Sequence, residues 1–345
     1  MDVWARWDSA WLVRIAEHGY ASAAQTGAFY PLYPALVGIL GRVLFGHYVV
    51  AGVVVSLVAA YGAFRLLYRL AASHLGAQEA RRAVLYLAVF PMSFFLQAVY
   101  SESLYVLLTV AAFLLAERVR FAWAGAVGGL ALLTRPSGIA LLPCLALLAW
   151  RSDDRRRSLL SLGLMPLLFV SYPLLLWYQV GDPLAFAHDE LDPLWARHLS
   201  AAGPFGGIWD GLAAGWWGVV QLASGSNTHQ YWTHVHDTTP LRMAAVNLEY
   251  LAFLLLFLCL TVVAWRRLGA VYGLFCALSL AIPLSVPSER WPLLSMPRFG
   301  LAVFPFFLAL ASLGRNPRVH TAILTVSAVL LGVAVTQWAL GQWVS

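Results

Sequence analysis

Residues 48–70 read YVVAGVVVSLVAAYGAFRLLYRL, and this apolar stretch decides the class of fold. A helix of about 20 residues, rising ~1.5 Å per residue, crosses the hydrocarbon core of a bilayer, and this run has that length. Further runs of the same character follow at 82–99, 103–118, 121–134, 137–150, 158–179, 248–265, 269–286, 299–314 and 319–340. We therefore predict an all-α polytopic membrane protein in which each of these runs is one pass.

The composition excludes an ordinary soluble protein. Of the 345 residues, 61% are hydrophobic and 11% are charged, and the mean hydropathy is +0.74. A soluble domain is about 45–50% apolar and about 25% charged. The formal net charge of +6 comes from arginines alone, because the chain has no lysine, and they stand in short clusters between apolar runs. This pattern indicates topology signals rather than a nucleic-acid partner, and arginine without lysine suggests a bacterial origin.

The placement of arginine predicts the orientation, because cytoplasmic loops carry an excess of basic residues. Strict alternation of the passes puts one set of arginines on a single face: Arg65, Arg69, Arg81, Arg82, Arg118, Arg120, Arg151, Arg155, Arg156, Arg157, Arg266, Arg267, Arg315 and Arg318. We predict that this face is cytoplasmic in a bacterial plasma membrane. The loops 1–47, 180–247 and 287–298 then lie outside.

The whole chain, 1–345, is expected to form one integral membrane domain. Residues 1–47 form an outer loop without a cleavable signal peptide, since no apolar core precedes the first pass. Within it, 29–46 is apolar but contains Pro31, Pro34 and Arg42, which favours an amphipathic helix at the outer interface. The loop 180–247 is long and rich in tryptophan, so we expect it to be ordered and to face the substrate.

The motif WARWDSAW at 4–11 is the first candidate site. Trp4, Trp7, Trp11 and Ile15 recur at helical spacing, which predicts one apolar face of a short interfacial helix. Asp8 would then lie beside aromatic rings at the membrane surface, where a carboxylate can serve as a general base on a hydroxyl. Spacing alone favours the simpler interpretation, a solvated aspartate on an interfacial helix.

Polar residues interrupt apolar sequence at three further places. Ser101 and Glu102 open the pass 103–118, where a serine is expected to cap the helix; for Glu102 a capping role and a site role are equally supported. Arg135 stands in LTRPSG between the short passes 121–134 and 137–150, at a depth where an unpaired charge is costly, and a guanidinium suits a phosphate. Arg298 could pair with Asp8, with Glu102 or with a ligand phosphate, or only anchor a helix end.

Other chemistry has weaker support in the sequence. His229, His234, His236 and Asp237 invite a metal interpretation, but their loop spacing fixes no geometry, and we assign no metal site. No Walker A motif, no Rossmann glycine fingerprint and no Gly-x-Ser-x-Gly elbow occurs. Nucleotide-dependent chemistry is therefore not expected.

Several of these segments together resemble the PIG-V family, the second mannosyltransferase of GPI-anchor assembly and its bacterial relatives. The resemblance is carried by WDSAWLVRIAEHGY at 7–20, FYPLYP at 29–34, FPMSFFLQAVYSESLY at 90–105, LALLTRPSGI at 130–139 and PRFGLAVFP at 297–305. It implies a GT-C-like glycosyltransferase fold with interfacial helices in the first outer loop. The family has a transmembrane helix before the Trp-Asp motif, whereas this sequence starts at that motif.

The resemblance also implies an activity. Such enzymes move mannose from a polyprenyl-phosphate donor to a lipid or glycan acceptor on the outer face, with inversion at the anomeric carbon, and Asp8 matches the base. A divalent cation is compatible with this chemistry but is not required by it. From the motifs we take as substrate-binding residues Arg6, Trp7, Trp11, Tyr33, Tyr100, Glu102, Arg135 and Arg298. The alternatives are a polytopic transporter or lipid flippase, in which broken helices also occur, and a non-catalytic membrane subunit.

Overall fold

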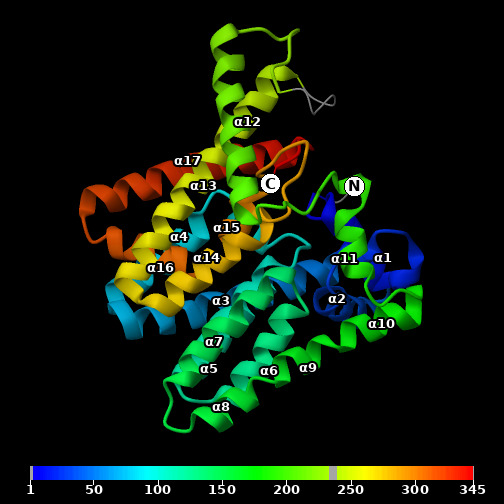
Figure 1. The fold of residues 1–345 in the computed structure, drawn as a ribbon, viewed down its shortest axis with the longest axis vertical. Helices are drawn as coiled ribbons and strands as arrows, with labels where there is room; N and C mark the ends of the chain where they lie inside the picture. Colours follow the sequence, from blue (N-terminus) through cyan, green and yellow to red (C-terminus); the bar gives the residue numbers. More distant parts are fainter. Residues whose placement is uncertain (1–2, 233–238, 345) are drawn as a thin grey trace.

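The computed structural model describes residues 3–232 and 239–344, and within these ranges it is built almost entirely of helices (Figure 1). In chain order the α-helices are α1 (Asp8–His18), α2 (Leu32–Val43), α3 (Tyr48–Leu75), α4 (Ala77–Val89), α5 (Glu102–Glu117), α6 (Phe121–Leu132), α7 (Leu141–Trp150), α8 (Arg155–Ser161), α9 (Leu164–Phe169), α10 (Ser171–Val180), α11 (Ala185–His188), α12 (Pro204–Ser224), α13 (Pro240–Leu268), α14 (Ala270–Leu284), α15 (Met296–Leu301), α16 (Pro305–Leu313) and α17 (Pro317–Ala339). Short 3-10 turns include η3 (Ser93–Leu96) and η4 (Pro136–Ala140).

Four helical stretches in the described residues are long and apolar enough to cross a membrane: Tyr48–Leu75, Arg155–Val180, Pro240–Leu268 and Pro317–Ala339. Shorter apolar helices, among them Leu32–Val43, Phe121–Leu132, Pro136–Trp150 and Ala270–Leu284, fill the space between them. Large apolar side chains such as Val58, Leu167 and Val329 are exposed on the long helices. Because such a surface is stable in lipid rather than in water, the chain is an integral membrane protein.

Two of the expected passes are broken by proline. The run 82–99 does not continue as one helix: α4 ends at Val89, and Phe90 adopts the extended backbone, ψ 143°, that a residue before proline prefers. The run 299–314 divides into α15 and α16, and Pro305, which has no N–H to donate, is the first residue of the second helix. These breaks put irregular backbone at 90–101 and near 302–304, beside the candidate site.

The residues before α3 form two helices, as expected, but with different bounds. The predicted interfacial helix at 29–46 is α2, while α1 begins only at Asp8. Trp4 and Trp7 therefore precede the helix instead of belonging to its apolar face, and Trp7 takes a positive φ of 52°. That backbone turn, which is strained for a bulky residue, places Asp8 in the first turn of α1.

The region 180–247 holds more regular structure than a loop. It contains α12, which packs against α13 and projects from the body of the molecule (Figure 1). Gly207, Gly211, Gly215 and Gly218 are buried on the face of α12, and a Cβ at Gly215 would come within 2.4 Å of the Leu251 side chain on α13. Small residues at this spacing let two helix backbones approach closely.

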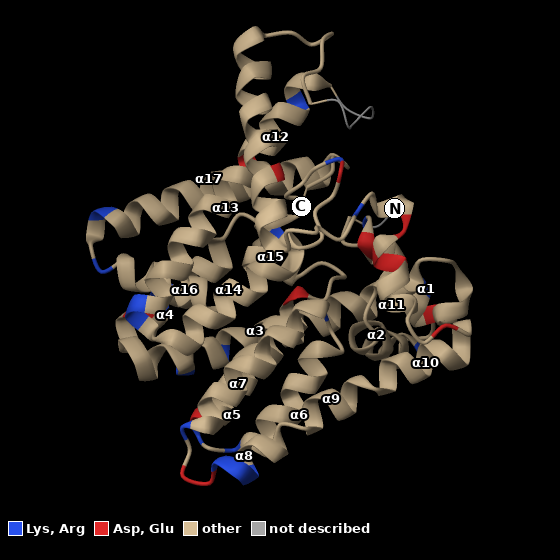
Figure 2. Ribbon diagram, in the orientation of Figure 1, with Lys and Arg blue, Asp and Glu red and all other residues tan. Residues whose placement is uncertain are grey.

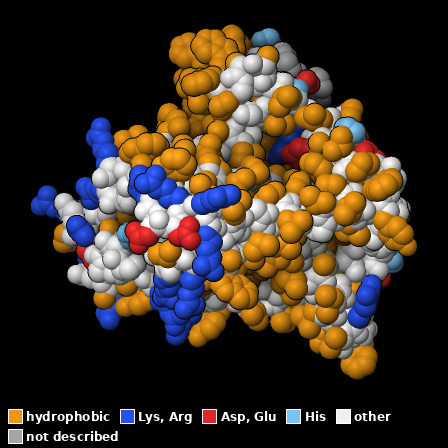
Figure 3. Space-filling model, turned by 60° about the horizontal axis from the view of Figure 1, so that its bottom comes forward, with side chains coloured by type: hydrophobic (Ala, Val, Ile, Leu, Met, Phe, Trp, Pro, Cys, Tyr) orange, Lys and Arg blue, Asp and Glu red, His pale blue; other side chains and the backbone are white. Residues whose placement is uncertain are grey.

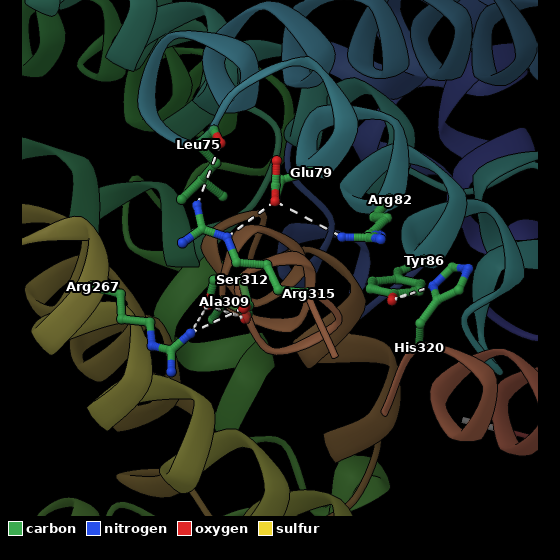
Figure 4. Close-up of polar contacts among 9 residues, drawn as sticks. All are labelled: Leu75, Glu79, Arg82, Tyr86, Arg267, Ala309, Ser312, Arg315 and His320. Carbon is green, nitrogen blue, oxygen red and sulfur yellow. Dashed lines mark hydrogen bonds and ion pairs between the residues drawn. The ribbon is translucent and has the colours of Figure 1, made fainter. Parts of the chain in front are cut away.

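Charged residues gather at particular helix ends (Figure 2). Arginines mark the junction of α16 and α17 and the start of α8, while acids cluster around α1 and α11. At one end of α4, Arg315 Nε lies 3.0 Å from Glu79 Oε1, and the Tyr86 hydroxyl lies 2.7 Å from His320 Nδ1 (Figure 4). These contacts join α4 to the connection between α16 and α17 and to α17 itself, and a third, from Arg267 to the Ser312 carbonyl at 3.0 Å, joins α13 to α16.

Candidate functional site

A chain of ion pairs links four residues that are far apart in sequence. Arg298 Nη1 lies 2.7 Å from Asp8 Oδ2, and Arg298 Nε lies 3.4 Å from Glu102 Oε1. Arg135 Nη1 lies 2.5 Å from the same oxygen of Glu102. Glu102 is 1% exposed and so depends on both arginines, because a buried carboxylate without counter-charge would cost several kcal/mol.

Local sequence places each of these groups. Asp8 and Glu102 are the first residues of α1 and α5, where backbone N–H groups and the helix dipole favour negative charge. Arg298 lies on α15, and its guanidinium is 5.4 Å from the ring centroid of Tyr100. The expected capping by Ser101 is absent, because its side chain makes no cap hydrogen bond.

The turn that carries Arg135 is held by close backbone contacts. Arg135 is extended, with φ −154° and ψ 147°, between the end of α6 and η4. Position 138 requires glycine, because a Cβ there would lie 2.5 Å from the Cα atom of Leu132. The Leu32 N–H donates to the Leu133 carbonyl at 2.9 Å, which fixes the start of α2 against the same turn. The turn that carries Arg135 and the N-terminal segment 3–47 are thus positioned together.

The four charged residues line one cavity. Its wall also includes Tyr30, Tyr100 and Phe299. Burial raises the pKa of Tyr30, so its phenol stays a neutral hydroxyl that can donate a hydrogen bond. We call this space the charged cavity. Seen from another side, charged side chains lie in a recess bordered by apolar ones (Figure 3).

A second cavity adjoins the charged cavity on the Arg135 side. The two share Tyr30, Arg135, Pro136, Glu190, Arg197 and Phe299. Away from this shared wall the lining is mostly apolar and comes largely from α14 and from the residues between α15 and α16, including Ile282, Pro283, Val286, Ala302 and Val303. We call it the apolar cavity. It suits a hydrocarbon chain whose polar end reaches Arg135.

A third cavity adjoins the charged cavity on the Asp8 side. The two cavities share Asp8, Trp195, Leu294 and Trp343, and the remaining aromatic lining of the third cavity is Trp7, Trp11 and Trp291. Arg242 and Ser288 add polar groups. We call it the tryptophan cavity. Flat indole faces with a few polar groups suit a sugar ring, which has apolar C–H faces and polar edges.

The structure brings together most of the predicted site residues. Asp8, Tyr100, Glu102, Arg135 and Arg298 line the charged cavity, and Trp7 and Trp11 line the tryptophan cavity.

Two predicted site residues lie elsewhere. Arg6 donates to the backbone carbonyls of Trp338, at 2.5 Å, and Ala339, at 3.2 Å, so it anchors the end of α17. Tyr33 has no exposed surface, and its hydroxyl is 3.0 Å from the Gly52 carbonyl and 2.8 Å from Ser56 Oγ. We therefore correct the sequence-based assignment: Arg6 and Tyr33 do not line the cavities.

Sequence reasoning missed residues from the long region 180–247. Glu190 and Arg197 form an ion pair and line both the charged and the apolar cavities, and Trp195 lines the charged and tryptophan cavities, as Asp8 does. The tryptophan content of 180–247 pointed to this region but not to individual side chains. Asp189 Oδ2 accepts from the Gly27 N–H at 2.8 Å and so ties this region to the N-terminal segment. Burial raises the pKa of Asp189, while that hydrogen bond lowers it.

The structure describes only part of the histidine motif that invites a metal interpretation. Within 3–232 and 239–344, no group of three or more His, Cys, Asp or Glu side chains is arranged to hold a metal ion. Of the histidine motif, His234, His236 and Asp237 lie outside the described residues.

Fold and site together define a helical integral membrane protein whose charged cavity lies between an apolar and an aromatic one. Residues 2–142 match the mannosyltransferase (PIG-V) family, which confirms the resemblance seen in the motifs. The matched residues include Asp8, Glu102 and Arg135. The predicted all-α membrane class is confirmed by the helices and their four apolar candidate spans. No curated protein sequence matches the chain.

Among solved structures, the chain is similar to the Archaeoglobus fulgidus oligosaccharyltransferase in a complex with Zn and sulfate, at 15% identity and a TM-score of 0.47, over 90% of this chain and 44% of that one. The same enzyme tethered to an acceptor peptide is 14% identical, with a TM-score of 0.48, over 92% of this chain and 48% of that one. ArnT from Cupriavidus metallidurans bound to undecaprenyl phosphate is 17% identical, with a TM-score of 0.39, over 91% of this chain and 68% of that one. The chain thus spans less than half the length of the oligosaccharyltransferase chains, and this distant likeness supports no detail of the site.

Proposed function

We propose that this protein is a membrane glycosyltransferase that moves a mannosyl residue from a polyprenyl-phosphate donor to a hydroxyl of a lipid or glycan acceptor. The observation that carries the proposal is the order of the three cavities. Arg135 lies on the wall between the apolar and charged cavities, and Asp8 lies on the wall between the charged and tryptophan cavities. The family match to residues 2–142 supports the sugar.

The donor would enter from the apolar side. Its polyprenyl chain would lie against Ile282, Val286 and Val303, and its phosphate would lie near Arg135. The phosphate gains one negative charge when the bond to the anomeric carbon breaks. A guanidinium fixed there before the reaction stabilises that charge without having to reorganise.

The acceptor would enter from the tryptophan side. Arg298 contacts Oδ2 of Asp8, which leaves Oδ1 for the acceptor hydroxyl. Asp8 would take the proton while the hydroxyl oxygen bonds to the anomeric carbon and the sugar–phosphate bond breaks, so that polyprenyl phosphate leaves. Attack from the face away from the phosphate inverts the anomeric carbon, in agreement with the resemblance.

Orientation is part of the proposal. The arginine clusters mark the cytoplasmic side, so the acceptor cavity would open on the other side, in a bacterial plasma membrane. Sealed vesicles of known orientation would test this, because a membrane-impermeant acceptor should be modified only when the face opposite the arginine clusters is outside.

The central test is transfer from radiolabelled polyprenyl-phosphate mannose by an Asp8→Asn variant. Losing a general base costs about 10²–10⁴-fold in rate, and donor binding should be retained. Asp182→Asn is the matched control, since Asp182 pairs with His188 at 2.7 Å in the outer region and lines none of the three cavities. Near-normal turnover by a folded Asp8→Asn protein would remove Asp8 from the role of base.

A further inference from the structure

The charged and apolar cavities contain a third arginine whose ion pair differs from the others. Arg197 pairs with Glu190, and both side chains reach the wall that the two cavities share. The Glu190 side chain is 32% exposed, whereas that of Glu102 is 1% exposed. The carboxylates of the two ion-pair systems therefore have very different access to water.

This difference decides which arginine can change its partner at low cost. Moving Arg135 or Arg298 to a new ligand would weaken the compensation of a carboxylate that water cannot reach, and an uncompensated buried charge is strongly destabilising. Moving Arg197 would release a carboxylate that can be hydrated, and a partly exposed ion pair contributes at most about 1 kcal/mol.

The backbone of Arg197 is fixed, so the exchange needs only a side-chain movement. Arg197 forms an antiparallel bridge with Ser288. On either side of it, the Glu289 N–H donates to the Ala196 carbonyl at 2.7 Å and the His198 N–H to the Pro287 carbonyl at 3.2 Å. The backbone of Arg197 is thus held in place, while its side chain can rotate at the wall that the two cavities share.

Charge balance supplies the reason for an exchange. The three acids Asp8, Glu102 and Glu190 and the three arginines 135, 197 and 298 line the charged cavity with no formal excess of either sign. A donor phosphate adds a negative charge at the Arg135 end. A cation must then turn toward it, and Arg197 is the one whose present partner can be hydrated.

We propose that Arg197 exchanges Glu190 for the donor phosphate and so acts as a second phosphate-binding residue beside Arg135, with Glu190 as its competitor in the empty site. This inference rests on the proposed function, because it assumes a polyprenyl-phosphate donor. It assigns opposite roles to the two members of one ion pair: Arg197 favours donor binding and Glu190 opposes it.

The opposite roles give a test that a purely structural ion pair would fail. Polyprenyl phosphate binding to the detergent-solubilised full chain would be measured by equilibrium titration, and the KM for polyprenyl-phosphate mannose by transfer. Arg197→Gln should raise both values roughly tenfold, as expected when one charge-assisted contact is lost. Glu190→Gln should lower both, and the double variant should match Arg197→Gln.

The controls separate this inference from the proposed function. Should Arg197→Gln not fold, Arg197→Lys, which keeps the charge but loses the planar guanidinium, should show a weaker effect of the same sign. If both single variants shift donor binding in the same direction, Arg197 and Glu190 form a structural pair and the inference is overturned. Wild-type protein that neither binds polyprenyl phosphate nor transfers mannose would instead overturn the proposed function.

Discussion

Replacing Glu102 by glutamine tests how the charged cavity is held together. The substitution keeps the size of the side chain and removes its charge, so no void forms and the effect is electrostatic. Glu102 is 1% exposed and is the carboxylate shared by Arg135, at 2.5 Å, and Arg298, at 3.4 Å. In the variant, Asp8 would be the one carboxylate left in this ion-pair chain with two arginines, Arg135 and Arg298, whose side chains are 12% and 11% exposed.

Breaking a buried ion pair by neutralising one partner costs about 3–5 kcal/mol. We expect the lower end, about 3 kcal/mol, because Arg135 borders a cavity that water can enter, and this is roughly a hundredfold in the folding equilibrium. Reversible unfolding in mixed micelles would measure it. Arg315→Gln is the control: it breaks the 3.0 Å pair with Glu79, but the Arg315 side chain is 57% exposed, so the loss should stay under about 1 kcal/mol. Equal losses from both variants would refute the idea that Glu102 is the electrostatic centre of the site.

Two further predictions concern residues beside the cavity. Gly138→Ala should destabilise the protein by about 1–3 kcal/mol or more in the same unfolding assay, because the new Cβ would meet the backbone of Leu132. Gly332→Ala is the control: Gly332 lies on α17 with open space around it, so the substitution should be neutral or stabilising. Tyr33→Phe should cost about 1 kcal/mol of stability through the lost hydrogen bonds to Gly52 and Ser56 and leave the donor and acceptor KM unchanged; a large KM change at full stability would restore Tyr33 to the site.

The sequence predicted the helical class because hydrophobic length is a direct physical requirement of the bilayer. It also singled out Asp8, Glu102, Arg135 and Arg298, since a charge beside apolar sequence is costly unless it is paired or used. Their pairing was only one of several possibilities for Arg298, because the contact joins residues 290 positions apart and depends on how the helices pack.

The errors have equally specific causes. Tyr33 and Arg6 lie in the same motifs as the cavity residues, and neighbours in sequence can point to different sides of the chain. The predicted passes 82–99 and 299–314 contain Pro91 and Pro305, but both runs were predicted as continuous helices because of their hydrophobicity. The irregular backbone beside the site was therefore not predicted. Arg197 could not be singled out because its place depends on the short antiparallel pairing of its segment with the residues around Ser288.

The ion pair between Asp8 and Arg298 also bears on how the protein is made. During synthesis, Asp8 and Glu102 emerge from the ribosome long before the helix that carries Arg298, so of the two arginines that pair with Glu102 only Arg135 is made early. The growing polypeptide must therefore keep its early carboxylates hydrated at the bilayer surface, and the electrostatic closure of the cavity becomes a late step of insertion, after α13 and α14 are in the membrane.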